Sequence, residues 1–230
     1  MKLVCSLICY FYLAIAYGGE WTVVTNNTLS FKGPIESSEF DKFKQVFSSD
    51  ITKIIVDSGG GDAEVGLAIG GLIAKADIDV EVQGICMSSC ANYIFTAGRN
   101  KILNRGIVGY HGNMTALVNS IGKEGLINQM KQNGFSEQQA TDFYNYYINE
   151  VLPHEKAFFS GLGISQDLFD RTQRDDKGMG FGVYSALLPK HATFEKYGIH
   201  NVTGEQSQDV IDNDPRVTKY VKLGAPVVID

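Results

Sequence analysis

The sequence predicts an α/β domain built on a parallel β-sheet and carrying a helical arm. Two observations predict the sheet. A β-branched run, a glycine-rich turn and a helical apolar pattern follow one another over 53–73, and the same order repeats over 80–97. Consecutive βα units favour parallel strands joined by right-handed crossovers. A third observation, mainly helical periodicity from Ala116 to about Phe159, predicts the arm.

The composition indicates one globular domain and excludes some partners. The chain has 230 residues, of which 44% are hydrophobic, enough to form one large core with an appended arm. The formal net charge is −6. A chain with this charge has no broad basic face for a phosphate backbone, so we expect no nucleic-acid partner.

The first residues have the pattern of a secretory signal peptide, which we assign to 1–17. Lys2 precedes an apolar run from Leu3 to Ala16, and Ala14 and Ala16 have the spacing that signal peptidase accepts. The run is shorter than the roughly 20 residues that cross a bilayer, which disfavours the alternative of a transmembrane anchor. We therefore expect an exported protein, periplasmic or secreted, with membrane contact only through an uncleaved signal.

Removal of the signal leaves two cysteines, Cys86 and Cys90. In an oxidising compartment a disulfide between them can persist, and the alternative is two small buried side chains. No CxxC pair or nearby histidine supplies further metal ligands, so we expect neither a metal nor a cofactor.

The first elements are a hairpin and a helix. Trp21–Val24 and Thr28–Phe31 are short strands on either side of a polar turn. The segment from Ser37 to Phe47 has apolar residues at helical spacing, with Ser37 or Ser38 available as the N-cap.

Two βα units follow. In the first, the strand Lys53–Val56 leads through a turn of three glycines to a helix that Asp62 caps. In the second, the strand Val80–Ile85 leads through the turn Cys86–Ser89 to the helix Ala91–Ala97.

The later segments are a third strand, the arm and the C-terminal part. Ile107–Tyr110 is a strand that ends at His111, and the arm occupies about 115–165. The segment 181–202 has a strand–helix–strand pattern that completes the main domain over 18–204. We expect the polar tail at 205–230 to be loosely ordered, except at Val227–Ile229.

The residues that carry chemistry lie at the ends of the predicted strands. Ser89 lies where a strand changes into a helix, a position suited to a nucleophile, and the next amide, of Cys90, can point at a developing oxyanion. The turn at Gly60 and Gly61 offers a second amide donor, because glycine permits close backbone approach. His111 follows a third strand and is placed to act as the general base.

These segments resemble a known family. DSGGGDAEVGLAIGGLIA, GICMSSCANYIFTAG and GIVGYHG look like the active-site blocks of the Clp protease proteolytic subunit, within the ClpP/crotonase-like superfamily, and most closely its exported bacterial relatives. The resemblance covers Ile54–Gly112, and a weaker similarity is found at Glu195–Ile199. It implies a repeated ββα superhelix with a parallel sheet. Alignment of Ala97-Gly98 with the family's Ala-Gly puts the following residues on the site: Ser89 as nucleophile, Gly61 and Cys90 as oxyanion donors, and His111 as base.

The chain also departs from the family pattern. Gly59 replaces a proline of the glycine turn, and Cys90 replaces the usual methionine after the nucleophile. Ser88 is the alternative nucleophile. The family takes the aspartate of its triad from a region after the arm, which here offers Asp170, Asp175 and Asp176; of these we favour Asp175 or Asp176.

The expected function is hydrolysis of a peptide or protein substrate through an acyl-enzyme, by an exported serine peptidase. The resemblance also implies a homo-oligomer assembled through the arm. Two alternatives remain open: a crotonase-type enzyme that stabilises the enolate of an acyl-coenzyme A, and a catalytically degenerate member that serves as a binding or assembly module of the cell envelope.

Overall fold

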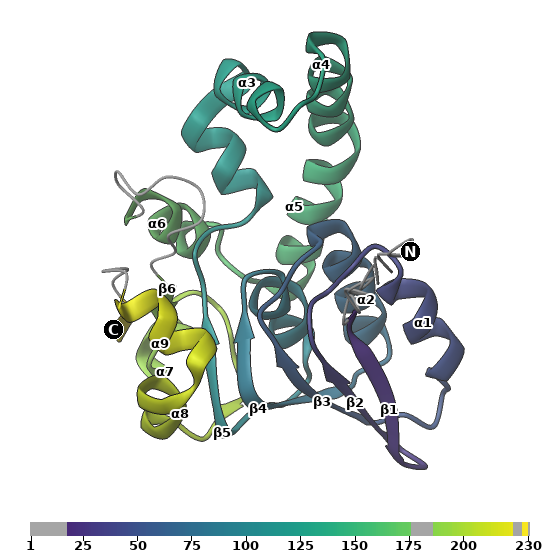
Figure 1. Cartoon of the computed structure of the whole chain (residues 1–230). Coiled ribbons are helices and arrows are strands. Elements are labelled where there is room, and N and C mark those ends of the chain that lie inside the picture. The colour runs from purple at the N-terminus through teal and green to yellow at the C-terminus, as the bar shows by residue number, and fades with distance from the viewer. Residues whose placement is uncertain (1–17, 176–185, 223–226, 230) are drawn as a thin grey trace, which may run out of the picture.

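A computed structural model of the chain describes residues 18–175, 186–222 and 227–229. The predicted signal peptide at 1–17 and Asp176 lie outside the described residues. Figure 1 shows a sheet with helices packed around it and an arm of helices that projects from one end.

The body is built on a six-stranded sheet in the order β1-β2-β3-β4-β5-β7. β1 and β2 form an antiparallel hairpin, and every other neighbouring pair is parallel. This confirms the predicted α/β class with a largely parallel sheet. The strands are β1 (Glu20–Thr25), β2 (Thr28–Lys32), β3 (Lys53–Ser58), β4 (Asp79–Met87), β5 (Lys101–Gly109) and β7 (Val202–Thr203).

Three helices connect the first strands: α1 (Glu39–Val46), α2 (Ala63–Lys75) and η1 (Cys90–Phe95), the last with π-helical hydrogen bonding. Asp62 caps α2 as the sequence predicts, since its carboxylate accepts from the amides of Glu64 and Val65. Ser38 precedes α1, but its side chain makes no capping hydrogen bond.

The core lies between the sheet and these helices. Alternate residues of the inner strands, such as Ile54, Val56, Val80 and Val82, are fully buried. They belong to the same apolar cluster as Ile69 of α2. Burying an aliphatic side chain of this size contributes about 1.5–3 kcal/mol, so the βα units hold the strand ends in fixed positions.

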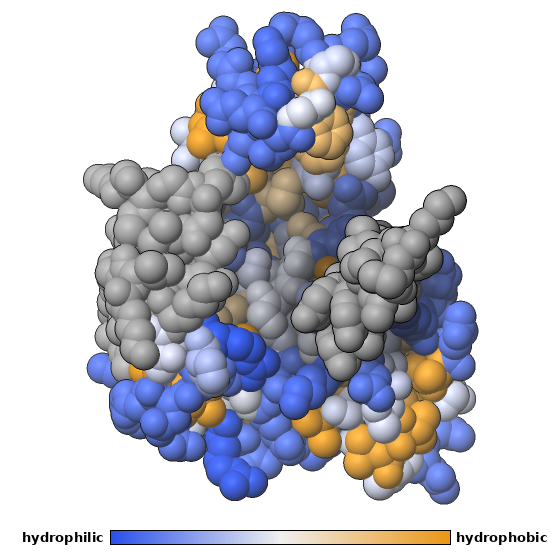
Figure 2. Space-filling model, viewed as in Figure 1, coloured by the Kyte–Doolittle hydropathy of each residue, from blue (hydrophilic) through white to orange (hydrophobic). Residues whose placement is uncertain are grey.

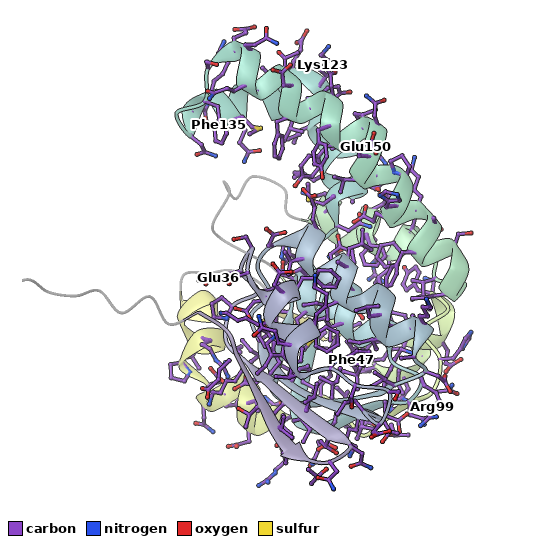
Figure 3. The ribbon with its side chains drawn as sticks, turned by 90° about the vertical axis from the view of Figure 1, so that its right-hand side faces the viewer. Glu36, Phe47, Arg99, Lys123, Phe135 and Glu150 are labelled. Atoms are coloured by element: carbon purple, nitrogen blue, oxygen red, sulfur yellow. A yellow bond between two sulfur atoms is a disulfide. The ribbon has the colours of Figure 1, made fainter. Side chains whose placement is uncertain are left out.

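The arm consists of α3 (Met114–Gln132), α4 (Glu137–Tyr146), η2 (Tyr147–Val151) and α5 (Leu152–Leu162). Figure 3 shows Lys123 and Phe135 at its far end and Phe47 and Arg99 in the body. A capping box at Ser136 and Gln139 begins α4. The predicted helical arm is therefore present, with a kink inside α3 at Gly122.

The C-terminal part differs from the sequence expectation. After α6 (Asp167–Asp175), β6 (Ala186–Leu188) and α7 (His191–Lys196), the chain forms α8 (Gln208–Asn213) and α9 (Pro215–Lys222). The expectation of a loosely ordered tail is wrong for these two helices. Strand β8 (Val227–Ile229) forms where the sequence favours order, and it pairs with β6.

The tail is ordered because its few apolar residues have a place to pack. Val217 is buried in a small cluster with Ile85 and Ile107 of the sheet and with Leu188, and Val210 packs against it. The tail is mostly polar, but each of its two helices has one apolar face. One such face is sufficient to order a helix when it can pack against a sheet.

Among the described helices, none is both long enough and apolar enough to span a bilayer. Figure 2 shows a face that is largely hydrophilic, with apolar side chains on the arm and at the lower right, where Val23 and Val24 of β1 are exposed.

Candidate active site

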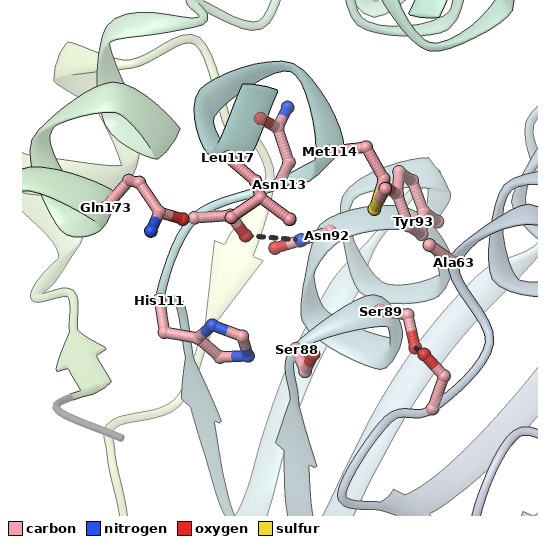
Figure 4. Close-up of a pocket in the computed structure, with 12 residues that line it drawn as sticks. Ala63, Ser88, Ser89, Asn92, Tyr93, His111, Asn113, Met114, Leu117 and Gln173 are labelled. Carbon is pink, nitrogen blue, oxygen red and sulfur yellow. Dashed lines mark hydrogen bonds between the residues drawn. The ribbon is translucent and has the colours of Figure 1, made fainter. Parts of the chain in front are cut away.

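Three loops meet at the carboxyl ends of neighbouring parallel strands. Residues 59–62 follow β3, residues 88–89 follow β4, and residues 110–113 follow β5. Because parallel strands end at the same edge of a sheet, this topology brings together the glycine turn, the serine turn and His111. Figure 4 shows these loops around one cavity.

The glycine turn lies directly against the serine turn. Gly60 has φ +89°, and a Cβ atom there would lie 2.5 Å from the carbonyl oxygen of Met87 and 2.9 Å from the amide nitrogen of Ser89. Gly61 has φ +149°, and a Cβ atom there would lie 2.1 Å from the carbonyl oxygen of Ile35. Both the positive φ angles and these distances require glycine.

The three predicted oxyanion donors differ in availability. The amide of Gly60 donates to Ser58 Oγ at 3.1 Å, so it is already engaged. The amide of Cys90 begins η1, where the first N–H groups of a helix have no intrahelical acceptor. Gly61 lines both cavities described below, so its main chain lies at the site.

The two serines of the turn point in different directions. Ser89, the predicted nucleophile, is 2% exposed, and its Oγ donates to the carbonyl oxygen of Gly61 at 3.2 Å. Ser88 is half-buried and has φ +57°, a left-handed conformation unusual for a side-chain-bearing residue. In Figure 4 Ser88 lies between His111 and Ser89. The structure therefore brings Ser88, rather than the Ser89 hydroxyl, next to the predicted base.

His111 follows β5 and sits in a desolvated position. Burial lowers its pKa from the usual value of 6.5, and a hydrogen bond with its own backbone partly opposes this. Figure 4 shows one ring nitrogen directed toward Ser88. A neutral imidazole in that orientation is the form that accepts a serine proton.

Two cavities adjoin at these residues. One has a volume of about 150 Å³ and extends toward Met114 and Leu117 at the base of the arm. The other has a volume of about 390 Å³ and extends toward Arg216 and Val217 on α9. Gly61, Ser88 and His111 line both cavities. An extended substrate occupying both would therefore pass the serine and the histidine.

A disulfide joins the residues on either side of the serine turn. Cys86, near the end of β4, is joined to Cys90, the first residue of η1, with a Cα–Cα distance of 5.2 Å. Both residues are fully buried. The covalent link fixes the corner at which the strand changes into the helix, which limits how far Ser88 and Ser89 can move.

The candidate aspartates lie on or beyond α6. Asp170 accepts from the Gln166 side chain at 3.3 Å and lines a separate cavity beside Gln173. Asp175 is the last residue of α6; its side chain and all of Asp176 lie outside the described residues. The helix that leads to them reaches the site, because Gln173 lines the smaller active-site cavity.

Sequence reasoning missed three residues at this site: Asn92, Gln173 and Arg216. Only tertiary packing brings Gln173 and Arg216 there. Asn92 carried a local signal, because it is an amide within the otherwise apolar run 91–95 that directly follows the serine turn.

The part of the chain that the structure describes contains no group of three or more His, Cys, Asp or Glu side chains that could hold a metal ion.

Solved structures similar to this chain include two proteases. A mutant of ClpP1 from Listeria monocytogenes is 17% identical, with a TM-score of 0.47, over 80% of this chain and 94% of that chain. A mutant of the membrane-bound stomatin-specific protease 1510-N is 16% identical, with a TM-score of 0.44, over 80% of this chain and 81% of that chain. No known protein-family profile and no curated protein matches the chain. At these identities and TM-scores, the family and chemistry of this chain have to be inferred from its own residues.

Proposed function

We propose that this protein is a Clp-like serine hydrolase, acting on peptide or protein substrates through an acyl-enzyme. The observation that carries the proposal is that Ser88 and His111 line the same two cavities, beside the main chain of Gly61. A hydroxyl, a neutral imidazole and a glycine turn are the parts that acyl transfer needs.

In the proposed reaction the serine oxygen attacks the substrate carbonyl while His111 takes the serine proton. The negative charge on the carbonyl oxygen is stabilised by two main-chain amides. One belongs to Gly61, and the other belongs to the residue after the nucleophile, which is Ser89 if Ser88 attacks and Cys90 if Ser89 attacks. His111 then gives its proton to the leaving amine, and the C–N bond breaks. In the second half, water attacks the acyl-enzyme, its proton passes through His111 to the serine, and the acid is released.

Of the two serines, the geometry favours Ser88. A serine with positive φ at a strand-to-helix corner has its hydroxyl presented outward, as in other hydrolases with a sharp nucleophile turn. The Ser89 hydroxyl donates instead to the Gly61 carbonyl, which couples the serine turn to the glycine turn. Ser89, the serine favoured by the family alignment, is the alternative nucleophile.

The test is covalent labelling of the purified protein with a fluorophosphonate, located by mass spectrometry. We expect the label on Ser88, with loss of labelling in Ser88→Ala and His111→Ala. The matched control is Ser89→Ala, which removes the neighbouring hydroxyl and should leave the label in place.

The outcomes separate the alternatives. A label on Ser89 that survives Ser88→Ala would assign the nucleophile to Ser89 and keep the hydrolase. Absence of any label on the assembled wild-type protein would contradict the hydrolase and favour the non-catalytic binding module.

The proposal includes export and self-association. The Cys86–Cys90 disulfide supports an oxidising compartment, because such bonds are rare in the cytosol. Exposed Phe135 and Tyr146 on the arm support contact with a second copy through it. Cleavage after residue 17, read by N-terminal sequencing of the exported protein, tests the first point. Mass measurement by light scattering tests the second, and a strictly monomeric protein would contradict it.

A further inference from the structure

The Cys86–Cys90 disulfide closes a very short loop around the two serines. The linked residues are 4 positions apart, so the loop encloses Met87, Ser88 and Ser89. The stabilisation that a disulfide gives to a whole fold grows with the length of the loop that it closes, so a loop this short contributes little to it. The effect of this bond is therefore mainly local, on the conformation of the three enclosed residues.

The enclosed turn has a backbone conformation that needs support. Ser88 has φ +57°, in the left-handed region, which is unfavourable for a residue that carries a Cβ atom. Such a conformation persists where the surrounding structure holds it in place. The glycine turn limits the room on one side, because a Cβ atom at Gly60 would lie 2.7 Å from Ser88 Cβ. A rotation of the turn would therefore change the direction of the Ser88 hydroxyl relative to His111.

Two main-chain hydrogen bonds also act on Ser88. Its amide donates to the carbonyl oxygen of Gly109 at 3.2 Å, and its carbonyl oxygen accepts from the amide of Asn92 at 2.8 Å. Ser88 is half-buried and lines both cavities, so water competes for these main-chain groups. A covalent bond between the residues on either side of the turn has no such competitor. The disulfide is thus a constraint on the turn that solvent does not loosen.

The disulfide is also sheltered once the protein has folded. Cys86 and Cys90 are fully buried and belong to the main apolar cluster of the core. Thiol–disulfide exchange requires a thiolate to reach one of the two sulfur atoms, and burial denies that access. The bond therefore forms before or during folding, and the folded protein keeps the state in which it folded.

We infer that oxidation of Cys86 and Cys90 activates the hydrolase, with the disulfide as the positioning device that holds Ser88 toward His111. The two thiols exchange with a disulfide oxidant: the Cys86–Cys90 S–S bond forms, the S–S bond of the oxidant breaks, and the oxidant leaves as two thiols that carry the two protons. The inference rests on the proposed function. It makes the chain a poor hydrolase where thiols stay reduced and an active one where disulfides persist.

The test compares oxidised and reduced protein in the folded state. The purified full chain is unfolded in urea with dithiothreitol and is refolded either with glutathione disulfide or with dithiothreitol retained, and mass spectrometry verifies the state of Cys86 and Cys90. Fluorophosphonate labelling is followed at several probe concentrations, which separates the maximal labelling rate from the probe concentration that gives half of it. Circular dichroism gives the folded fraction, and rates are expressed per folded molecule.

We expect the reduced protein to fold and its maximal labelling rate per folded molecule to be roughly tenfold to a hundredfold lower, because a small displacement of a nucleophile has effects of this size. The probe concentration for half-maximal labelling should change little, since the disulfide acts on the reaction rather than on binding. A disulfide with a purely structural role would lower the folded fraction and leave the rate per folded molecule unchanged. That result would overturn the inference.

The matched control is the double variant Cys86→Ala with Cys90→Ala, in which a small apolar side chain suits each buried position. It should label at the rate of the reduced wild-type protein under both refolding conditions. Cys5 and Cys9 of the predicted signal peptide are unchanged in this variant. A response of the variant to glutathione disulfide would therefore belong to those residues and would overturn the inference. Failure of both the reduced protein and the variant to fold would overturn it as well.

The failure of this inference is distinguishable from that of the proposed function. If the oxidised wild-type protein is not labelled, the hydrolase proposal fails. If oxidised and reduced protein are labelled at equal rates per folded molecule, the hydrolase stands and the inference fails.

Discussion

The proposed role of His111 as a base requires its neutral form, and burial favours that form. The loop that carries it is held by the Asn92 bond to Gly112, and Gly112 itself has φ +106°. The loop that carries His111 is thus held in place by main-chain geometry and by this hydrogen bond more than by ion pairs. Among the residues described around the two cavities, Arg216 is the one with a charged side chain, and it is paired with Asp57 and Asp214.

The pH dependence of the proposed activity follows from this environment. Because burial lowers the pKa of His111 below 6.5, the neutral base persists at pH 7 and is lost only as the pH falls through the lowered value. We predict a fluorophosphonate labelling rate that is flat around pH 7 and half-maximal below pH 6.5. A half-maximal rate above pH 6.5 would show that another group, or a stabilised imidazolium, controls the reaction.

At the scale of elements, one buried carboxylate joins the arm to the body. Glu155 of α5 is fully buried and accepts from the amides of Met114 and Thr115, at 3.2 and 2.8 Å, and from the hydroxyl of Tyr93. It therefore fastens the start of α3, which follows the His111 loop, to η1, which follows the serine turn. Tyr93 reflects this contact, because burial and the nearby Glu155 raise the pKa of its hydroxyl well above the usual value.

Glu155→Leu removes this acceptor and leaves two backbone amides and the hydroxyls of Tyr93 and Thr115 without it. We predict a loss of about 2–5 kcal/mol in the free energy of unfolding, measured by urea denaturation. Glu150→Leu, at an exposed position on the same arm, is the control and should change stability by less than about 0.5 kcal/mol. Equal effects of the two substitutions would contradict the anchoring role.

At the scale of the whole molecule, the C-terminal helices close one side of the site. Arg216 of α9 bonds to Asp57 of β3 at 2.8 Å and to Asp214 at 2.6 Å. Asp57 also accepts from the amide of Ile85 at 3.1 Å, where the register between β3 and β4 shifts. The two carboxylates raise the pKa of Arg216, which stays charged. The larger cavity therefore depends on a contact between residues more than 150 positions apart in the sequence.

Arg216→Met should loosen α8 and α9 from the sheet. The side chain is partly exposed, so we predict a modest stability loss of about 1 kcal/mol or less. Limited proteolysis should then cut the C-terminal segment faster than in wild-type protein. Arg99→Met removes an exposed arginine that pairs with Asp77 and Asp79 elsewhere in the body, and should leave that cleavage rate unchanged. An unchanged cleavage rate in Arg216→Met would contradict the view that Arg216 holds the C-terminal helices against the sheet.

The sequence by itself determined the local elements and their type. Period-two and period-3.6 apolar patterns, the glycine turn and the Asp62 cap are local features, so they predicted the parallel βα units and the arm correctly. They also placed Gly61, Ser88, Ser89 and His111 at strand ends, which parallel topology brings to one edge.

Tertiary structure alone decided the details of the site and of the tail. Which serine faces His111 depends on a single positive φ angle at Ser88, which side-chain patterns do not encode. The Asn92 bond to Gly112 and the Arg216 bond to Asp57 join segments far apart in the chain. Helices α8 and α9 form because the sheet buries Val217, whereas the tail alone has too few apolar residues to offset the entropy of ordering. Long-range packing supplies that stabilisation, so composition of the tail could not reveal it.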